Sequence, residues 1–202
     1  MVRCQAPGWM YSGIVIRSGE TPVGADGLAE AEYVLTAKHC VDGATKSRVT
    51  VRFQNGYETS GVPHDWQGGW DGPAILRIPR DRYPTSVISR NYAKARAQKI
   101  WALGYPGGTT KLHRKVGVVL GVSNISGVPM NEFSQAQWPG YSGGPLYNQD
   151  GQVLGVASCT DFRHTWHISQ TSIALLCAKH GLRPSIADQD FPVQEEPPPW
   201  AY

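Results

Sequence analysis

The chain has 202 residues, of which 41% are hydrophobic and 17% are charged, and its formal net charge is +3. This length allows one large domain or two small ones that share a core. The weak positive charge gives no electrostatic reason to expect nucleic acid or an anionic membrane as the main partner. No stretch approaches the roughly 18 apolar residues of a membrane span, and the N-terminal segment lacks the pattern of a secretory signal. We therefore expect an intracellular protein or one released from a larger precursor, with an oligomeric state that the sequence leaves open.

Turn-forming residues punctuate the whole chain, which contains 23 glycines and 15 prolines. They divide the sequence into short segments and favour an all-β fold over a helical one. In the first half the expected strands cover residues 12–17, 32–37, 48–53 and 73–78. After a polar linking stretch at 80–95, further strands are expected at residues 98–103, 114–121, 145–147 and 152–157. Two successive β-rich halves predict two packed barrels, over residues 1–90 and 91–183.

The apolar period changes near the C-terminal end, where residues 170–180 have the spacing of a helix. Ser169 or Thr171 can cap its start, and Gly181 can stop it. One face of this helix would carry Ile173, Leu176, Cys177 and His180. The remaining tail, residues 184–202, is acidic and rich in proline, so we expect an extended arm.

Three segments carry residues suited to nucleophilic catalysis. Residues 33–43 end an apolar strand at His39, residues 70–78 place Asp71 before another apolar strand, and residues 139–147 hold Ser142 among glycines. A serine hydroxyl is a poor nucleophile at neutral pH unless an imidazole takes its proton during attack. A buried carboxylate then fixes the imidazole tautomer and stabilises the imidazolium.

The glycines around Ser142 serve a second purpose. They allow a sharp turn that can aim the N–H groups of Gly140 and Ser142 at one point, where a carbonyl oxygen would become an oxyanion. The loss of one such donor costs about 3–4 kcal/mol of transition-state stabilisation.

These segments resemble motifs of the trypsin-like serine proteases. LTAKHC is similar to the histidine motif of that family, DGPAILRI to its aspartate motif and GYSGGPL to its nucleophile motif. WALGYPGG and DGQVLGVAS resemble the bacterial and viral branch, which lacks the vertebrate disulfides. The resemblance covers about residues 12–183. It implies two six-stranded antiparallel Greek-key barrels with a C-terminal helix, and a serine endopeptidase that cuts a protein or peptide substrate without a cofactor.

The resemblance also implies roles for a substrate-binding pocket. The strand at Ala157, Ser158, Cys159 and Thr160 would pair with substrate and wall the pocket, and Ala136 would stand where a trypsin-type enzyme needs an acid. A pocket histidine, His164 or His167, would select Glu or Gln. Tyr141 replaces the aspartate that pairs with a newly cut N-terminus in pancreatic enzymes, which argues against that kind of zymogen.

Several alternatives remain open. Asp71 is one residue further from Ala74 than is usual, so Asp65 is a second candidate acid. A catalytically silent binding or structural module of the same fold is the main rival function, and within the protease reading the chain is either a polyprotein-processing enzyme or a free-standing one. An α/β-hydrolase is disfavoured because only about 60 residues follow Ser142.

Two other groups of residues have a simpler interpretation. The basic group at residues 111–115 is expected to form a solvated loop, with recognition of an acidic substrate as the alternative. The cysteines are expected as small buried side chains, and the absence of a CxxC spacing gives a metal site no support. They are Cys4, Cys40, Cys159 and Cys177.

Overall fold

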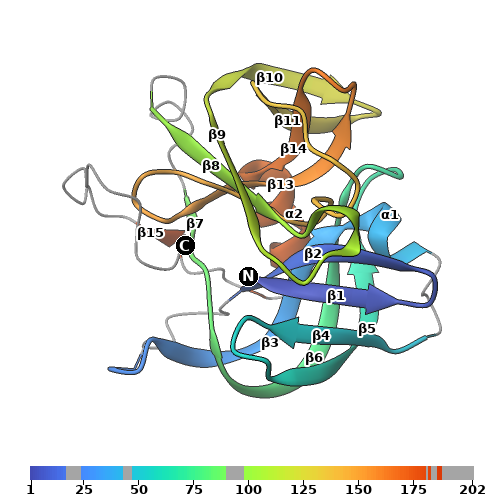
Figure 1. The fold of residues 1–202 in the computed structure, drawn as a ribbon, viewed down its shortest axis with the longest axis vertical. Helices are drawn as coiled ribbons and strands as arrows, with labels where there is room; N and C mark the ends of the chain where they lie inside the picture. Colours follow the sequence, from blue (N-terminus) through green and yellow to red (C-terminus); the bar gives the residue numbers. More distant parts are fainter. Residues whose placement is uncertain (17–23, 43–46, 90–97, 181, 183–185, 188–202) are drawn as a thin grey trace.

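A computed structural model describes the chain except for residues 17–23, 43–46, 90–97, 181, 183–185 and 188–202. Two β-sheets make up most of the molecule, with β1 to β6 in the lower half and β8 to β14 in the upper half of Figure 1. In the part of the chain that is described, no helix has the length and apolar character needed to cross a membrane.

The first half is a closed barrel with strand order β1-β2-β3-β6-β5-β4. All its strand pairs are antiparallel. Because β3 pairs with β6, the end of β3 and the start of β6 lie side by side, with Ala37 opposite Pro73. The strands are β1 (Val2–Ala6), β2 (Trp9–Ile16), β3 (Leu28–Ala37), β4 (Val49–Phe53), β5 (Glu58–Trp66) and β6 (Pro73–Pro84).

The second half is a nine-stranded sheet with the main path β10-β11-β14-β13-β12-β8-β9. Two short strands, β7 (Ile88–Ser89) and β15 (Ile186–Ala187), pair with each other in parallel, and β7 also pairs with β13. The longer members are β8 (Ile100–Gly104), β9 (His113–Gly117), β10 (Val119–Ile125), β11 (Val128–Phe133), β12 (Pro145–Tyr147), β13 (Val153–Thr160) and β14 (Thr165–Ser169).

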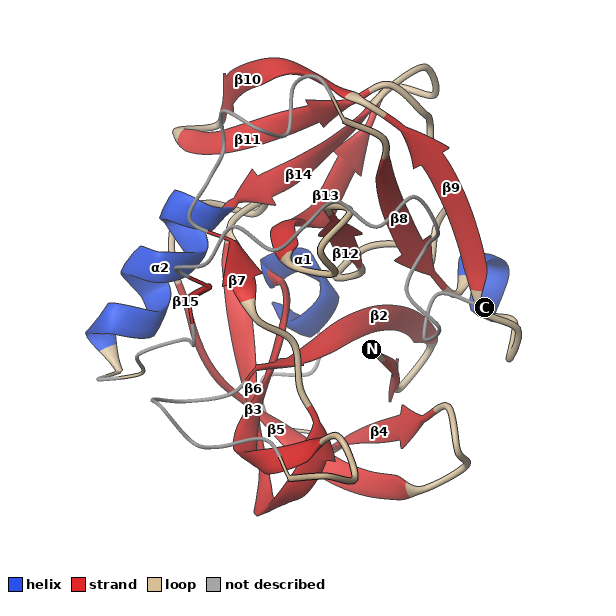
Figure 2. Ribbon diagram, turned by 90° about the vertical axis from the view of Figure 1, so that its left-hand side faces the viewer, coloured by secondary structure: helices blue, strands red, loops and turns tan. Residues whose placement is uncertain are grey.

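A single large apolar core joins the two halves. It contains buried residues of the barrel, such as Leu35 and Ile75, together with Ile168 and Leu176 of the second half. Helix α2 (Gln170–Lys179) contacts β6 of the barrel and β11, β13 and β14 of the second sheet, and Figure 2 shows it along one side of the molecule. The two halves are therefore fixed to each other by burial of shared apolar surface.

The expected all-β fold with a C-terminal helix is confirmed, and each expected strand overlaps an observed one. The first half is the six-stranded barrel that was expected, whereas the second half is a nine-stranded sheet instead of a six-stranded barrel. Ser169 is the observed cap of α2, since its side chain accepts a hydrogen bond from the Ser172 N–H. The strands that the sequence did not reveal are β1, β5, β11 and β14, together with the two-residue strands β7 and β15. β5 and β11 each contain a proline, a residue that weakens a strand pattern.

Three expected boundaries differ from the structure. β6 runs on to Pro84, so the linking stretch expected from residue 80 begins as strand. The strand expected at 114–121 is two strands, β9 and β10, with a corner at Val118, where the Val118 N–H donates to Ser134 Oγ at 3.0 Å. Within the expected tail, β15 joins the second sheet. The expected helix stop, Gly181, and residues 188–202 of the tail lie outside the described residues.

Candidate active site

His39 lies in the short helix α1 (Lys38–Val41), which begins directly where β3 ends. Two backbone hydrogen bonds attach this helix to the loop before β6. The Lys38 N–H donates to the Gly72 oxygen at 2.8 Å, and the His39 N–H donates to the Trp70 oxygen at 3.2 Å. The pairing of β3 with β6 thus brings the segments of His39 and Asp71 to one end of the barrel.

The His39 ring is partly buried and stacks on Trp70, with ring centroids 6.1 Å apart and an interplanar angle of 25°. Its Nδ1 atom is buried and has no hydrogen-bond partner among the described residues. Burial lowers the pKa of His39 below the ordinary value of 6.5, although the carboxylates of Asp71 and Asp42 act to raise it. The imidazole is therefore neutral at pH 7, the state in which it can accept a proton.

Asp71 is held by a residue of the other half of the molecule. Ser158 Oγ, on β13, donates to the Asp71 main-chain oxygen at 3.0 Å and lies 3.4 Å from its carboxylate Oδ1. Asp71 also acts on the neighbouring Cys159, whose thiol pKa is raised to about 11 by burial and by this negative charge. The carboxylate therefore lies at the junction of the barrel and the second sheet.

Ser142 lies in a tightly bent loop between β11 and β12 that is hydrogen-bonded to both sheets. The Ser12 N–H donates to the Ser142 oxygen at 2.8 Å, and the Gly143 N–H donates to the Ala157 oxygen at 2.8 Å. Gly143 has φ +80°, and a Cβ there would meet the Ser12 oxygen at 2.0 Å. Only glycine fits this position without movement of the barrel.

The peptide groups before Ser142 are also fixed. Ser12 Oγ donates to the Gly140 oxygen at 2.8 Å, and the Gly107 N–H donates to the Pro139 oxygen at 2.8 Å. Gly140 has φ +100°. In the part of the chain that the structure covers, the N–H groups of Gly140 and Ser142 donate no hydrogen bond. Both donors are thus available to a ligand.

Tyr141, between these two donors, is 2% exposed. Its ring lies against Gly104, where an added Cβ would come within 2.4 Å of the ring. Burial raises the pKa of the Tyr141 phenol to about 12, so this side chain is a neutral packing group at pH 7.

A pocket of about 210 Å³ opens beside Ser142. The four predicted wall residues line it together with Ser142, whereas no charged side chain does. The complete lining consists of Gln137, Trp138, Pro139, Tyr141, Ser142, Ala157, Ser158, Cys159, Thr160, Phe162 and Thr165. The pocket suits an uncharged side chain better than a charged one, because a charge moved into it would lose its hydration without an ionic partner.

Ala136 does not line the pocket, contrary to the expectation from the resemblance to trypsin-type enzymes. Its carbonyl oxygen accepts a hydrogen bond from Lys115 Nζ. The next residue, Gln137, faces the pocket instead and is 4% exposed.

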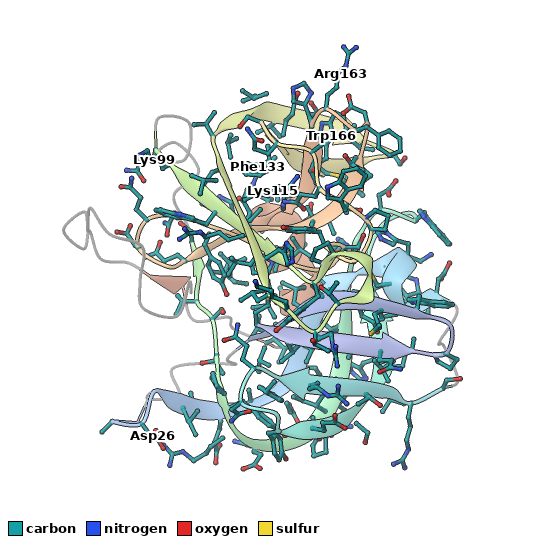
Figure 3. The ribbon with its side chains drawn as sticks, in the orientation of Figure 1. Asp26, Lys99, Lys115, Phe133, Arg163 and Trp166 are labelled. Carbon is teal, nitrogen blue, oxygen red and sulfur yellow. The ribbon has the colours of Figure 1, made fainter. Side chains whose placement is uncertain are left out.

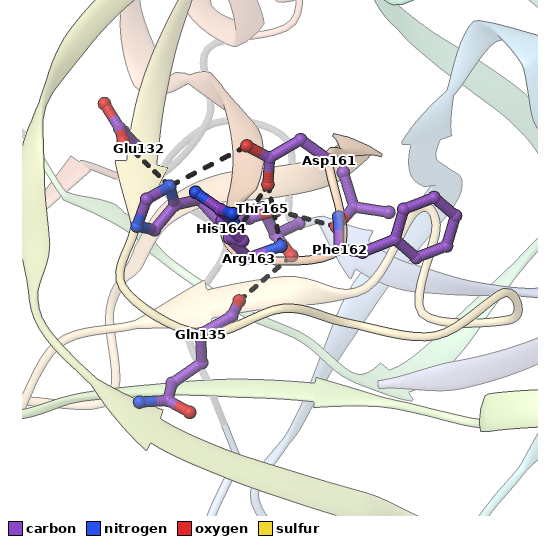
Figure 4. A network of polar contacts seen from close by, with 8 residues as sticks. Glu132, Gln135, Asp161, Phe162, Arg163, His164 and Thr165 are labelled. Carbon is purple, nitrogen blue, oxygen red and sulfur yellow. Dashed lines mark hydrogen bonds and ion pairs between the residues drawn. The ribbon is translucent and has the colours of Figure 1, made fainter.

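Neither histidine proposed for the pocket lines it. His167 is fully buried behind Gln137, with 3.3 Å between His167 Nε2 and Gln137 Nε2. Burial lowers the pKa of His167 to about 3, so the ring is uncharged at pH 7. His164 lies in the β13–β14 hairpin, where its Nδ1 is 3.4 Å from Glu132 Oε1 and 3.9 Å from Asp161 Oδ2, as Figure 4 shows.

Asp65, the second candidate acid, is bound to helix α2 instead of His39. Its Oδ2 lies 2.6 Å from both His180 Nε2 and Lys179 Nζ. Partial burial acts to raise the pKa of Asp65, but the hydrogen bonds from Lys179 and His180 outweigh it and lower the pKa to about 2. The contacts of Asp65 therefore serve to dock α2 on the barrel.

The structure brings the three motif segments to one junction but does not join their side chains directly. Across the described residues, no hydrogen bond links His39 to Asp71 or to Ser142. The same residues contain no cluster of metal-ligating side chains, and all four cysteines are free. Sequence reasoning missed the contributions of Ser12, Trp70 and Gln137. Trp70 alone had a visible signal, since it directly precedes Asp71.

Comparison with known proteins places these observations in a family. The chain matches the trypsin-like peptidase domain family over residues 11–156, a range that contains His39, Asp71 and Ser142. It is 28% identical over 136 residues to a probable periplasmic serine endoprotease DegP-like of Halomonas elongata, and 32% identical over 131 residues to one of Marinomonas sp.. These alignments cover 65% and 62% of this chain but only 28% and 27% of the relatives, so the chain spans less than a third of their length.

Solved structures share the fold. The Rv3671c protease in its inactive form superposes with a TM-score of 0.70 at 24% identity, covering 88% of this chain and 87% of that one. The serine endoprotease from Yersinia pestis gives 0.68 at 19% identity, covering 89% and 61%. The motif order, the two-sheet fold and the match over residues 11–156 agree, and the chain belongs to the family of trypsin-like peptidase domains.

Proposed function

We propose that the protein is a serine endopeptidase in which Ser142 is the nucleophile, His39 the general base and Asp71 the residue that orients His39. The single observation that carries this proposal is the bond from Ser158 to Asp71, because it ties the acid of the barrel to the strand that flanks Ser142. The DegP-like relatives, which are named as serine endoproteases, support the same reaction class.

In the first half-reaction, Ser142 Oγ attacks the carbonyl carbon of the scissile peptide bond while His39 Nε2 takes the hydroxyl proton. The carbonyl oxygen becomes an oxyanion, and the free N–H groups of Gly140 and Ser142 are suited to stabilise it. The C–N bond then breaks, the amine leaves with the proton from His39, and an acyl-enzyme remains.

In the second half-reaction, a water molecule attacks the acyl carbon and gives a proton to His39. The bond from the acyl carbon to Ser142 Oγ breaks, and that oxygen regains the proton. Throughout this sequence Asp71 is required to accept a hydrogen bond from His39 Nδ1. Catalytic hydrogen bonds are often long or misaligned without substrate, and the charge of Asp71 already acts on His39, so we expect the unpartnered Nδ1 to bond Asp71 when substrate is bound.

A catalytically silent binding module is the second candidate function, and the unpartnered His39 Nδ1 is the observation that favours it. A fluorophosphonate probe separates the two, since it reacts only with an activated serine. We expect the wild-type chain to be labelled, and Ser142→Ala and His39→Ala to remain unlabelled. Ser134→Ala, which changes a serine outside the pocket, is the control. A folded wild-type chain that resists the probe would favour the silent module.

Excision from a longer precursor is a finer proposal within the protease reading. A precursor that carries flanking sequence is expected to be cut at the ends of this domain. The Ser142→Ala precursor is expected to stay intact, and mass spectrometry of both products tests this. Intact wild-type precursor would argue for a free-standing enzyme.

A further inference from the structure

A second cavity, of about 570 Å³, lies where β1 and β4 of the barrel meet the chain segment between β8 and β9. Three cations line it, namely Arg3, Arg52 and Lys111, and no acidic side chain does. Phe53 and Leu112 supply apolar wall, and Tyr105 contributes a buried phenol. The cavity does not include Ser142 or any other member of the candidate site.

Arg3 is the unusual member of this group, because it is only 6% exposed. Its Nη1 makes a hydrogen bond of 3.5 Å to the Thr109 oxygen, at the limit of such a contact. Among the described residues, no carboxylate forms an ion pair with Arg3 or with Lys111. A guanidinium that is nearly buried and lacks an anionic partner is costly unless a ligand supplies one.

The neighbouring groups fit the same ligand. Arg52 is balanced by Glu58, to which it is ion-paired, so the net positive charge of the cavity comes from Arg3 and Lys111. Burial raises the pKa of Tyr105, and the charge of Arg3 acts against this rise. The phenol therefore keeps its proton at pH 7 and stays a hydrogen-bond donor close to the guanidinium.

We propose that this cavity is an exosite that binds an acidic peptide segment, with carboxylates at Arg3 and Lys111 and an apolar side chain against Phe53 and Leu112. A peptide fits better than a nucleic acid for two reasons. The cations of the cavity share it with apolar walls that can take a side chain, and the net charge of the whole chain is only +3.

The cavity is connected to the loop of Ser142 through a short chain of contacts. The Tyr105 N–H donates to Ser12 Oγ at 3.2 Å, and Ser12 Oγ donates to the Gly140 oxygen at 2.8 Å. A peptide bound at the cavity would therefore lie close to the candidate active site. The use of the exosite to select substrates rests on the proposed function, whereas the binding itself does not.

Fluorescence anisotropy tests the binding in the full chain carrying Ser142→Ala, so that no probe is cut. The probe is fluorescein-labelled Glu-Phe-Glu-Glu-Leu-Glu, and its counterpart has glutamine in place of each glutamate. We expect the acidic probe to bind at least about tenfold more tightly than its counterpart, and to bind more weakly as salt screens the charges. Equal binding of the two peptides would overturn the exosite.

Two charge reversals locate the site. Lys111 is exposed, so Lys111→Glu should fold normally and weaken binding of the acidic probe by at least about tenfold. Lys99→Glu is the matched control, because Lys99 is exposed and lies just before β8 (Figure 3), roughly 20 Å along that strand from Tyr105. It should bind the probe as the parent does. An equal effect of both reversals, or displacement of the probe by oligothymidylate at a lower concentration than by the unlabelled peptide, would refute the proposal.

The outcome is separable from that of the proposed function. If the wild-type chain binds the acidic probe but does not react with the fluorophosphonate, the exosite proposal stands and the peptidase proposal fails. A chain that reacts with the fluorophosphonate but fails to distinguish the two peptides would give the reverse outcome.

Discussion

Ser158 Oγ lies 3.0 Å from the main-chain oxygen of Asp71 and 3.4 Å from its carboxylate, so one hydroxyl of the second sheet fixes the acid of the barrel. We expect Ser158→Ala to lower the rate of fluorophosphonate labelling by about tenfold, the size of effect typical of a lost hydrogen bond to a charged group. Ser158→Thr keeps the hydroxyl and should recover most of the rate. A thermal unfolding curve of each variant shows whether the fold is intact, and an unchanged rate in a folded Ser158→Ala variant would remove the positioning role.

The two candidate acids should differ strongly in their effect on catalysis. Asp71→Asn is expected to reduce kcat by about four orders of magnitude, because the amide favours the wrong imidazole tautomer. Asp65→Asn should leave kcat within about twofold of wild type, since Asp65 contacts Lys179 and His180. Steady-state kinetics on a peptide substrate decides between them, and the reverse ranking would reassign the acid to Asp65.

The rate of fluorophosphonate labelling should depend on pH through the protonation of His39. Its pKa is lowered by burial from 6.5, and a protonated imidazole cannot act as a base. The labelling rate is thus expected to rise with pH, with its midpoint below 6.5. A midpoint clearly above 6.5 would show that the charge of Asp71 outweighs burial.

The contact of Asp65 with α2 should contribute to stability in a pH-dependent way. The folded pKa of Asp65 is about 2, below the ordinary 3.8, so its contribution is complete above pH 4 and is lost as pH falls toward 2. The pair with Lys179 is partly solvated, and we expect Asp65→Asn to lower the free energy of unfolding by about 1 kcal/mol at pH 7. Urea unfolding at pH 7 and pH 3 should show a smaller difference at pH 3. A difference that grows at low pH would contradict this.

Alanine substitution at two glycines should show how much stability is lost through an unfavourable φ angle alone and how much through a steric clash of the added Cβ. Gly143 and Gly127 have almost the same φ, +80° and +81°, but a Cβ at Gly127 meets nothing within 4 Å. Gly127→Ala should cost about 1 kcal/mol of unfolding free energy. Gly143→Ala should cost at least about 3 kcal/mol, because its Cβ overlaps the Ser12 oxygen and Thr36 Oγ1. Urea denaturation of both variants makes the comparison, and equal costs would mean that the loop moves away freely.

The sequence predicted the fold well where local patterns are strong. Alternating or continuous apolar runs revealed strands such as β3 and β13, and the spacing of apolar residues with a capping serine revealed α2. It failed for β5, in which a glycine and a proline interrupt the alternation. That strand is held by its two neighbours in the barrel, and such pairing leaves no local signal.

The candidate site also combines residues that local motifs predict with contacts that only the folded chain creates. The motif segments predict His39, Asp71 and Ser142 as candidate site residues, but no pattern could show that Ser12 Oγ would bond Gly140, because 128 positions separate them in the chain. Ala136 was expected at the pocket from the resemblance to trypsin-type enzymes, and that expectation carries no information on how this loop bends. In the structure Gln137, and not Ala136, lines the pocket.

The division of the candidate site between two sheets has a consequence for biosynthesis. The proposed base and acid belong to a barrel that ends with β6, whereas the proposed nucleophile and the strand that anchors Asp71 emerge later. Under the proposed mechanism, a nascent chain whose first barrel has just left the ribosome cannot hydrolyse neighbouring polypeptides, because Ser142 and β13 are complete only when translation has passed residue 160.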